Sequence, residues 1–201
     1  MADLAVVAAE LQAHLIATYK FEVVNKEDSD LMKAIAWGMD VGSKVVSSLP
    51  NSHDFMTLFA TTIGRTVALP KVMRDNPMSV CEVVTHECQH VIQFADTGVA
   101  FAWFYITDNS ARAQFEADAY ASGLIVHSWL TGRVPTEDLD WVVQNLVRSY
   151  HLRPEDAAYA KVALKSLFAS WASGIIMTRS ARTAVAFLEA KYPELKGTVP
   201  A

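Results

Sequence analysis

Cysteine is scarce in this chain, with only Cys81 and Cys88 among 201 residues. Both fall within one expected helix and are seven residues apart, so they would lie about 10 Å apart along its axis. That separation is too large for a disulfide between them. Without disulfides the fold has to be stabilised by its core, and the low cysteine content is typical of a reducing compartment.

Long apolar runs and concentrated positive charge are also missing. No run reaches the roughly 18 apolar residues of a membrane-spanning helix, and the first ten residues lack the basic segment of a secretory signal. We therefore expect a cytoplasmic protein, with a phage virion or non-classical export as the alternative. The formal net charge is −5 with no basic patch, which argues against nucleic acid as a partner.

The composition is that of a protein with one substantial core. Hydrophobic residues make up 52% of the chain, and a chain of this length can bury a sizeable core in one domain. Nothing in the sequence requires a second domain, so we expect a single domain over residues 1–201. The apolar, aromatic segment 98–106 is expected to pack in that core, the alternatives being a wall of a substrate site or a partner surface.

The residues that carry chemistry are His86, Glu87 and His90, which form an HExxH pentapeptide. On a helix, two histidines four residues apart project from one face and can bind a single Zn²⁺ ion. The glutamate then lies beside the position left open for water. This spacing predicts hydrolytic metal chemistry.

The sequence around the pentapeptide predicts the helix that this geometry requires. Asn76 is a suitable N-cap, and Pro77 suits the first helical position. Apolar residues then recur at helical spacing and give the segment a face to bury. The motif therefore lies in the middle of a helix.

A strand or hairpin is expected just before that helix, over residues 55–70. The segment alternates, is rich in β-branched residues, and has a turn or bulge at Gly64-Arg65. A strand pair followed by an HExxH helix resembles the core of the zincin metallopeptidases, in which an edge strand aligns the substrate backbone above the metal. The resemblance covers roughly residues 55–130. It implies a helix-rich, compact α+β domain with a small β-sheet packed over the active-site helix.

A catalytic zinc site typically has three protein ligands, so one more is needed. Glu116 lies in an expected helix after the capping cluster 108–110, and this placement resembles the second helix of gluzincins, which supplies a glutamate ligand. The string from Glu116 to Ala121 is also similar to a segment of small intracellular zincins. Many gluzincins have an aspartate four residues after that ligand, where this chain has Tyr120.

Two aspartates have competing or supporting roles. Asp96 lies six residues after His90, the position of the third ligand in metzincin-like sites, but those sites have a helix-breaking glycine where this chain has Gln93. Glu116 is therefore preferred as the ligand. Asp118 is a candidate for orienting a ligand imidazole through its free N–H.

The resemblance implies a zinc-dependent metallopeptidase that acts on a protein or peptide. Its metal ligands would be His86, His90 and Glu116, and Glu87 would be the general base that accepts a proton from the attacking water. A further donor is expected for the oxyanion. His127 is one candidate for it, and the group Tyr150, His151 and Arg153 is the other. The alternative function is an inactive zincin-like binding or structural module, for example a component of a phage particle or toxin assembly.

The remainder of the chain is expected to be mainly helical. The patterns predict helices over 1–19 and 28–47, a helix start at 136–138, a helix from Pro154, and a last helix over about 180–191. The oligomeric state and the cleavage specificity are not encoded in any motif of the sequence.

Overall fold

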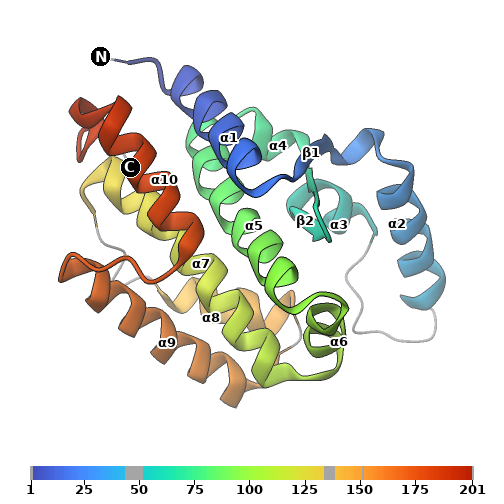
Figure 1. Cartoon of the computed structure of the whole chain (residues 1–201). Helices are drawn as coiled ribbons and strands as arrows, with labels where there is room; N and C mark the ends of the chain where they lie inside the picture. Colours follow the sequence, from blue (N-terminus) through green and yellow to red (C-terminus); the bar gives the residue numbers. More distant parts are fainter. Residues whose placement is uncertain (1, 44–51, 134–138, 151, 201) are drawn as a thin grey trace.

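The computed structural model describes residues 2–43, 52–133, 139–150 and 152–200, which form a helix-rich α+β fold (Figure 1). The described helices are α1 (Leu4–Tyr19), α2 (Asp30–Ser43), α3 (Ser52–Leu58), α4 (Lys71–Arg74), α5 (Pro77–Thr97), α6 (Val99–Thr107), α7 (Asn109–Thr131), α8 (Leu139–Arg148), α9 (Pro154–Ala172) and α10 (Arg179–Lys191). Two short 3-10 helices are also described, η1 (Lys26–Asp28) and η2 (Pro193–Leu195). The expected helix end at 44–47 and helix start at 136–138 lie outside the described residues.

Helix α5, which carries the HExxH pentapeptide, is at the centre of the fold (Figure 1). The Asn76 side chain accepts hydrogen bonds from the backbone N–H groups of Met78 and Ser79, at 3.0 and 3.2 Å, and Pro77 is the first helical residue. Both features were predicted from the sequence and are confirmed. At the other end, the N–H of Gly98 bonds to Phe94 O at 2.7 Å and closes the helix.

Helix α7 packs against α5, and their close approach depends on Gly123. A Cβ atom at this position would lie 2.8 Å from the carbonyl oxygen of Glu82 on α5. Any larger residue would therefore push the two helices apart. The start of α7 is capped as predicted, because the Asp108 carboxylate accepts bonds from Ser110 N and Ala111 N at 2.9 and 3.1 Å.

A three-stranded sheet packs on α5, in the order β1 (Glu22–Asn25), β3 (Thr66–Leu69), β2 (Thr61–Ile63). Strand β1 is parallel to β3, whereas β2 is antiparallel to β3 and forms an edge of the sheet. The two faces differ: Val67 belongs to the large core that includes α5, and Ala68 belongs to a small cluster with Phe55. Helices α2 and α3 supply the rest of that small cluster.

The prediction for residues 55–70 is half right. The hairpin and its turn are confirmed, with Gly64 at φ 62° between β2 and β3. The first part is wrong, because Phe55 to Leu58 belong to helix α3. Burial of Phe55 against α2 outweighs the local β preference, since tertiary packing overrides propensity. Strand β1 was not predicted.

The expectation that segment 98–106 packs in the core is wrong for most of its side chains. Val99, Trp103 and Ile106 on α6 are 84%, 67% and 71% exposed, whereas Phe101 is buried. Helix α6 thus presents one face to the interior and a wide apolar face to the surface. Among the described residues, no helix combines the length and apolar character needed to cross a membrane.

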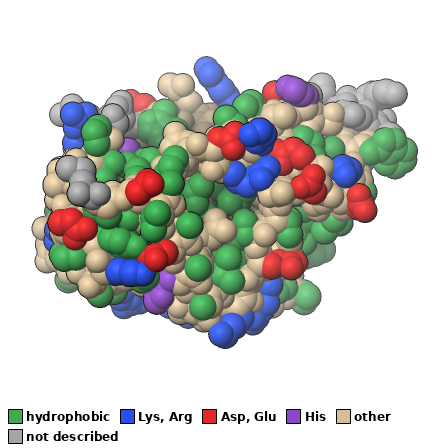
Figure 2. Space-filling view, turned by 90° about the horizontal axis from the view of Figure 1, so that it is seen from above, with side chains coloured by type: hydrophobic (Ala, Val, Ile, Leu, Met, Phe, Trp, Pro, Cys, Tyr) green, Lys and Arg blue, Asp and Glu red, His purple; other side chains and the backbone are tan. Residues whose placement is uncertain are grey.

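On the face shown in Figure 2, acidic and basic side chains are interspersed with hydrophobic ones. The Lys and Arg side chains drawn in blue do not form a broad patch on that face. Cys81 and Cys88 are both free and buried in α5, and burial raises the pKa of each thiol. The two thiols are therefore uncharged parts of the core.

Candidate metal centre

The fold brings His86 and His90 of α5 together with Glu116 of α7. One ligand atom from each of the three lies within 4.8 Å of the other two. The His86 Nε2 atom is 3.7 Å from Glu116 Oε2, and His90 Nε2 is 3.5 Å from Oε1. Ligand atoms about 2.0–2.1 Å from a tetrahedral zinc ion are about 3.3–3.4 Å apart. The two distances from the imidazoles to Glu116 are therefore within a few tenths of an ångström of those in a bound site, and the whole cluster lies within 4.8 Å.

The Glu116 carboxylate is fully buried and only partly satisfied. Tyr105 OH donates a hydrogen bond to Oε1, while Oε2 is buried without any hydrogen-bond partner among the described residues. Burial raises the pKa of Glu116 to about 7, although the Tyr105 and Tyr150 hydroxyls and the charge of Arg112 act in the opposite direction. An unpaired buried carboxylate oxygen is unfavourable. A cation held between the three side chains would supply the missing partner, so the residues fit a metal ion.

Gln93 orients His90 and selects its tautomer. Gln93 Nε2 donates to the carbonyl oxygen of Phe115 at 3.0 Å, which places Oε1 of the same amide 2.8 Å from His90 Nδ1. Because that oxygen can only accept, Nδ1 has to carry the proton. The lone pair of the imidazole is then on Nε2, the atom that faces Glu116. This is the arrangement a metal ligand needs.

Gln93→Leu is expected to weaken zinc affinity by about 10- to 100-fold, because the imidazole loses the partner that fixes its ring and tautomer. Competition with a zinc chelator of known affinity measures the effect. The matched control is Gln144→Leu, the same change at an exposed residue of α8, which should bind zinc like the unaltered protein. Equal affinities in the two variants would contradict the orienting role.

Glu87 lies beside the cluster and is also buried. Thr62 Oγ1 of the edge strand β2 donates to Glu87 Oε2 at 2.5 Å, and the other oxygen, Oε1, is 4.0 Å from His86 Nε2. Burial raises the pKa of Glu87, and the negative charge of Glu116 acts in the same direction. A carboxylate with a raised pKa next to a metal site is suited to accept and return a proton near neutral pH.

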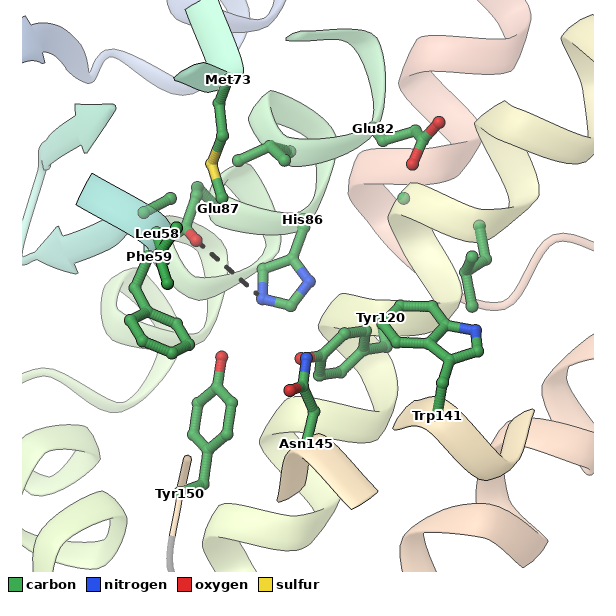
Figure 3. Close-up of a pocket in the computed structure, with 14 residues that line it drawn as sticks. Leu58, Phe59, Met73, Glu82, His86, Glu87, Tyr120, Trp141, Asn145 and Tyr150 are labelled. Atoms are coloured by element: carbon green, nitrogen blue, oxygen red, sulfur yellow. Dashed lines mark ion pairs between the residues drawn. The ribbon is translucent and has the colours of Figure 1, made fainter. Parts of the chain in front are cut away.

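Two cavities meet at this cluster. The first, of about 220 Å³, is lined by His86, Glu87 and residues including Phe59, Tyr120, Trp141, Asn145 and Tyr150. The second, of about 480 Å³, is lined by His90, Glu87 and Glu116, by β2, and by residues of α6. Phe59, Ala60, Glu87 and Tyr150 line both cavities. In Figure 3 the Tyr150 hydroxyl points into the space between Phe59 and His86.

The structure separates the competing sequence candidates. Asp96, the alternative third ligand, is on the surface and forms an ion pair with Arg179. Asp118 does not bond directly to a ligand histidine in the described contacts; it accepts a bond from Gln114 Nε2 at 2.9 Å. Burial raises the pKa of Asp118, while Gln114, His90 and Gln93 all act to lower it. The orienting role expected of Asp118 belongs to Gln93.

The structure also separates the candidates for the oxyanion donor by their distance from the metal site and by their hydrogen-bond partners. His127 Nδ1 is 2.7 Å from Glu82 Oε1, which raises the pKa of this imidazole. Eleven residues along a straight helix place it about 16 Å from Glu116. Arg153 bonds to Asp156 at 2.6 Å, and His151 is outside the described residues. Tyr150 is the member of the expected set that the structure places in both cavities.

Sequence reasoning missed four contacts of the site, made by Gln93, Tyr105, Thr62 and Phe59. Gln93 had a detectable signal, because it lies three residues after His90 and therefore on the neighbouring turn. The others belong to α6, to strand β2 or to the residue stretch just before β2, and their side chains reach the cluster only through the tertiary fold. No local pattern marks them.

Comparisons of the chain with protein-family models, with curated proteins and with solved structures found no match.

Proposed function

We propose that this protein is a zinc-dependent metallopeptidase. The supporting observation is a buried His86, His90 and Glu116 donor set, with an unpartnered Glu116 oxygen, directly beside Glu87. Zinc peptidases bind their metal through two imidazoles and a carboxylate and leave a fourth position for water. A carboxylate that could act as a base next to such a site is the other half of this hydrolytic chemistry.

The donor set favours zinc, because imidazole nitrogen and one carboxylate are its usual ligands in catalytic sites. When bound, zinc supplies Lewis-acid chemistry that makes water nucleophilic at neutral pH and polarises a carbonyl group. The protein has to provide the remaining functions. These are to move a proton, to stabilise the developing oxyanion and to hold the substrate.

Glu87 is assigned the proton transfer. Its carboxylate would accept a proton from the attacking water and then deliver it to the leaving amine. The hydrogen bond from Thr62 holds one carboxylate oxygen, so the other oxygen, next to His86, is the one free to take the proton. The raised pKa keeps the protonated state accessible at the second step.

Tyr150 is assigned the donor to the oxyanion. It lines both cavities beside Glu87, and burial together with the negative charge of Glu116 raises the pKa of its phenol well above the usual value. The hydroxyl therefore stays protonated and can donate. Tyr150 takes this role in preference to His127, which lines neither cavity and pairs with Glu82.

A peptide substrate would lie along β2. This strand is at the edge of the sheet, and in the described part of the chain its outer edge has no partner strand. An extended peptide can add to such an edge through main-chain hydrogen bonds. Its side chains on the two sides of the scissile bond would then enter the two cavities. Phe59, Trp141 and Phe101 are among the residues lining them, which favours bulky apolar side chains there.

The test combines metal content with cleavage of an unfolded protein such as casein. We expect one zinc per chain, and cleavage that a chelator stops and added zinc restores. Zinc binding without turnover would favour the alternative, a non-catalytic zincin-like module. Absence of zinc after reloading would overturn the metal site itself.

A further inference from the structure

Lys26, at the start of η1, is a fully buried cation outside the metal cluster. Several surface basic groups lie beside acidic ones, as the ion pairs Lys71–Asp75 and Arg74–Glu27 show, and basic and acidic side chains also adjoin on the face in Figure 2. Lys26 differs, because no carboxylate of the described residues forms an ion pair with it. Burying an ammonium group without a carboxylate in direct contact is costly and calls for a specific compensation.

The groups that the Lys26 ammonium contacts directly are neutral and all lie within residues 55–61. The ammonium group donates to Phe59 O at 2.8 Å and to Thr61 Oγ1 at 2.7 Å, and it lies 3.6 Å from the centroid of the Phe55 ring. Burial lowers the pKa of Lys26 to about 8, while Glu87 and Glu27 act to raise it. The group is therefore mainly protonated at neutral pH, and the aromatic face stabilises its charge.

The two threonines of β2 attach this strand on opposite faces. Thr61 pairs with Ala68 and Thr62 pairs with Val67, so their side chains point to opposite sides of the sheet. On one side Thr61 accepts from Lys26, and on the other Thr62 donates to Glu87. The edge strand is therefore held between the buried lysine and the proposed general base.

The same lysine also holds the residues that join the two cavities. Phe59, whose carbonyl oxygen Lys26 binds, lines both of them, and Ala60 does so too. We propose that Lys26 is a positioning residue, whose buried ammonium group holds the segment 59–61 and the edge strand β2 at the place where a peptide substrate meets the metal site. This inference rests on the proposed peptidase function for its substrate, but not for the attachment of β2.

Hydrogen exchange tests the attachment directly and needs no activity. In Lys26→Met, which keeps the length of the side chain and removes its charge and donors, the amides of residues 59–63 should exchange about tenfold faster. The amides of α5 around the metal ligands should exchange at the unaltered rate, and zinc affinity should stay the same. Lys33→Met, the same change at an exposed lysine of α2, is the control.

Thr61→Val is the second variant and removes only the hydroxyl that Lys26 binds. It should accelerate hydrogen exchange at the same amides, and it therefore tests the proposal even if Lys26→Met fails to fold. Unaltered exchange over residues 59–63 in Thr61→Val, or acceleration spread over the whole chain, would overturn the proposal.

Kinetics distinguish positioning from a general loss of structure. Lys26→Met should raise KM for a peptide about tenfold and lower kcat less than about threefold, because a displaced edge strand weakens binding uniformly. A smaller fraction of folded protein would instead lower kcat and leave KM unchanged, and that result would contradict the proposal. If the unaltered protein cleaves nothing, the peptidase function fails, while the exchange rates still show whether Lys26 holds β2.

Discussion

Glu87→Gln is expected to lower kcat by about 10²- to 10⁴-fold, because the amide cannot accept a proton from water or return it to the leaving amine. Glutamine has nearly the same shape, and its oxygen can still accept the hydrogen bond from Thr62. The metal ligands are unaltered, so the variant should still bind one zinc ion. Initial rates on a peptide that the unaltered protein cleaves, together with zinc content, measure both quantities.

The matched control is Glu189→Gln on α10. Glu189 bonds to Lys196 at 3.0 Å and lines neither cavity of the metal site. It should leave the rate within about twofold of the unaltered value, as surface substitutions away from special features have small effects. A Glu87→Gln protein that keeps its zinc and its full rate would contradict the assignment of the base.

Glu116→Gln is expected to weaken zinc affinity by more than about 100-fold. Loss of a group that only orients a ligand weakens affinity by up to about 100-fold, and loss of a ligand itself should weaken it more. The substitution removes the negative charge and replaces a carboxylate oxygen by an amide, a poor zinc ligand. Cleavage should be lost at zinc concentrations that saturate the unaltered protein. Equilibrium competition with a chelator measures the affinity, and elemental analysis gives the stoichiometry.

Asp96→Asn is the control, because Asp96 was the competing ligand in the sequence and lies on the surface against Arg179. It should bind zinc with unchanged affinity. Tight binding in Glu116→Gln combined with loss in Asp96→Asn would reverse the assignment of the third ligand. Zinc should also raise the melting temperature of the unaltered protein and of Asp96→Asn, but not that of Glu116→Gln, since a ligand that binds only the native state stabilises it.

The part of the site that could be predicted is encoded over short stretches of sequence. The HExxH spacing places His86 and His90 on one side of a turn of helix, and the caps Asn76 and Asp108 define where the two ligand helices begin. Helical periodicity depends on neighbouring residues, so it can be read without the fold. Glu116 could be proposed because it is on the second of these helices, although the distance between the helices could not be predicted.

The predictions from the sequence failed where the tertiary packing, and not the local pattern, decided which side chains are buried. Phe55 to Leu58 were predicted as extended but form α3, since Phe55 is buried in the cluster with Met32 and Ala68. The aromatic segment 98–106 was expected in the core but forms a helix with most of its large side chains at the surface. Hydrophobicity indicates that a side chain tends to be buried, not against which element it packs.

The sequence alone thus specified the candidate metal ligands, the spacing of His86 and His90 on α5 and the helical character of the chain, because these depend on interactions a few residues long. Only the tertiary structure showed that Gln93 orients His90, that Tyr105 binds Glu116, and that Lys26 is buried beneath the approach to β2. Apart from the bond between His90 and Gln93, these contacts join separate elements. They arise when packing around Gly123 brings α7 onto α5, and when the sheet covers the α5 helix.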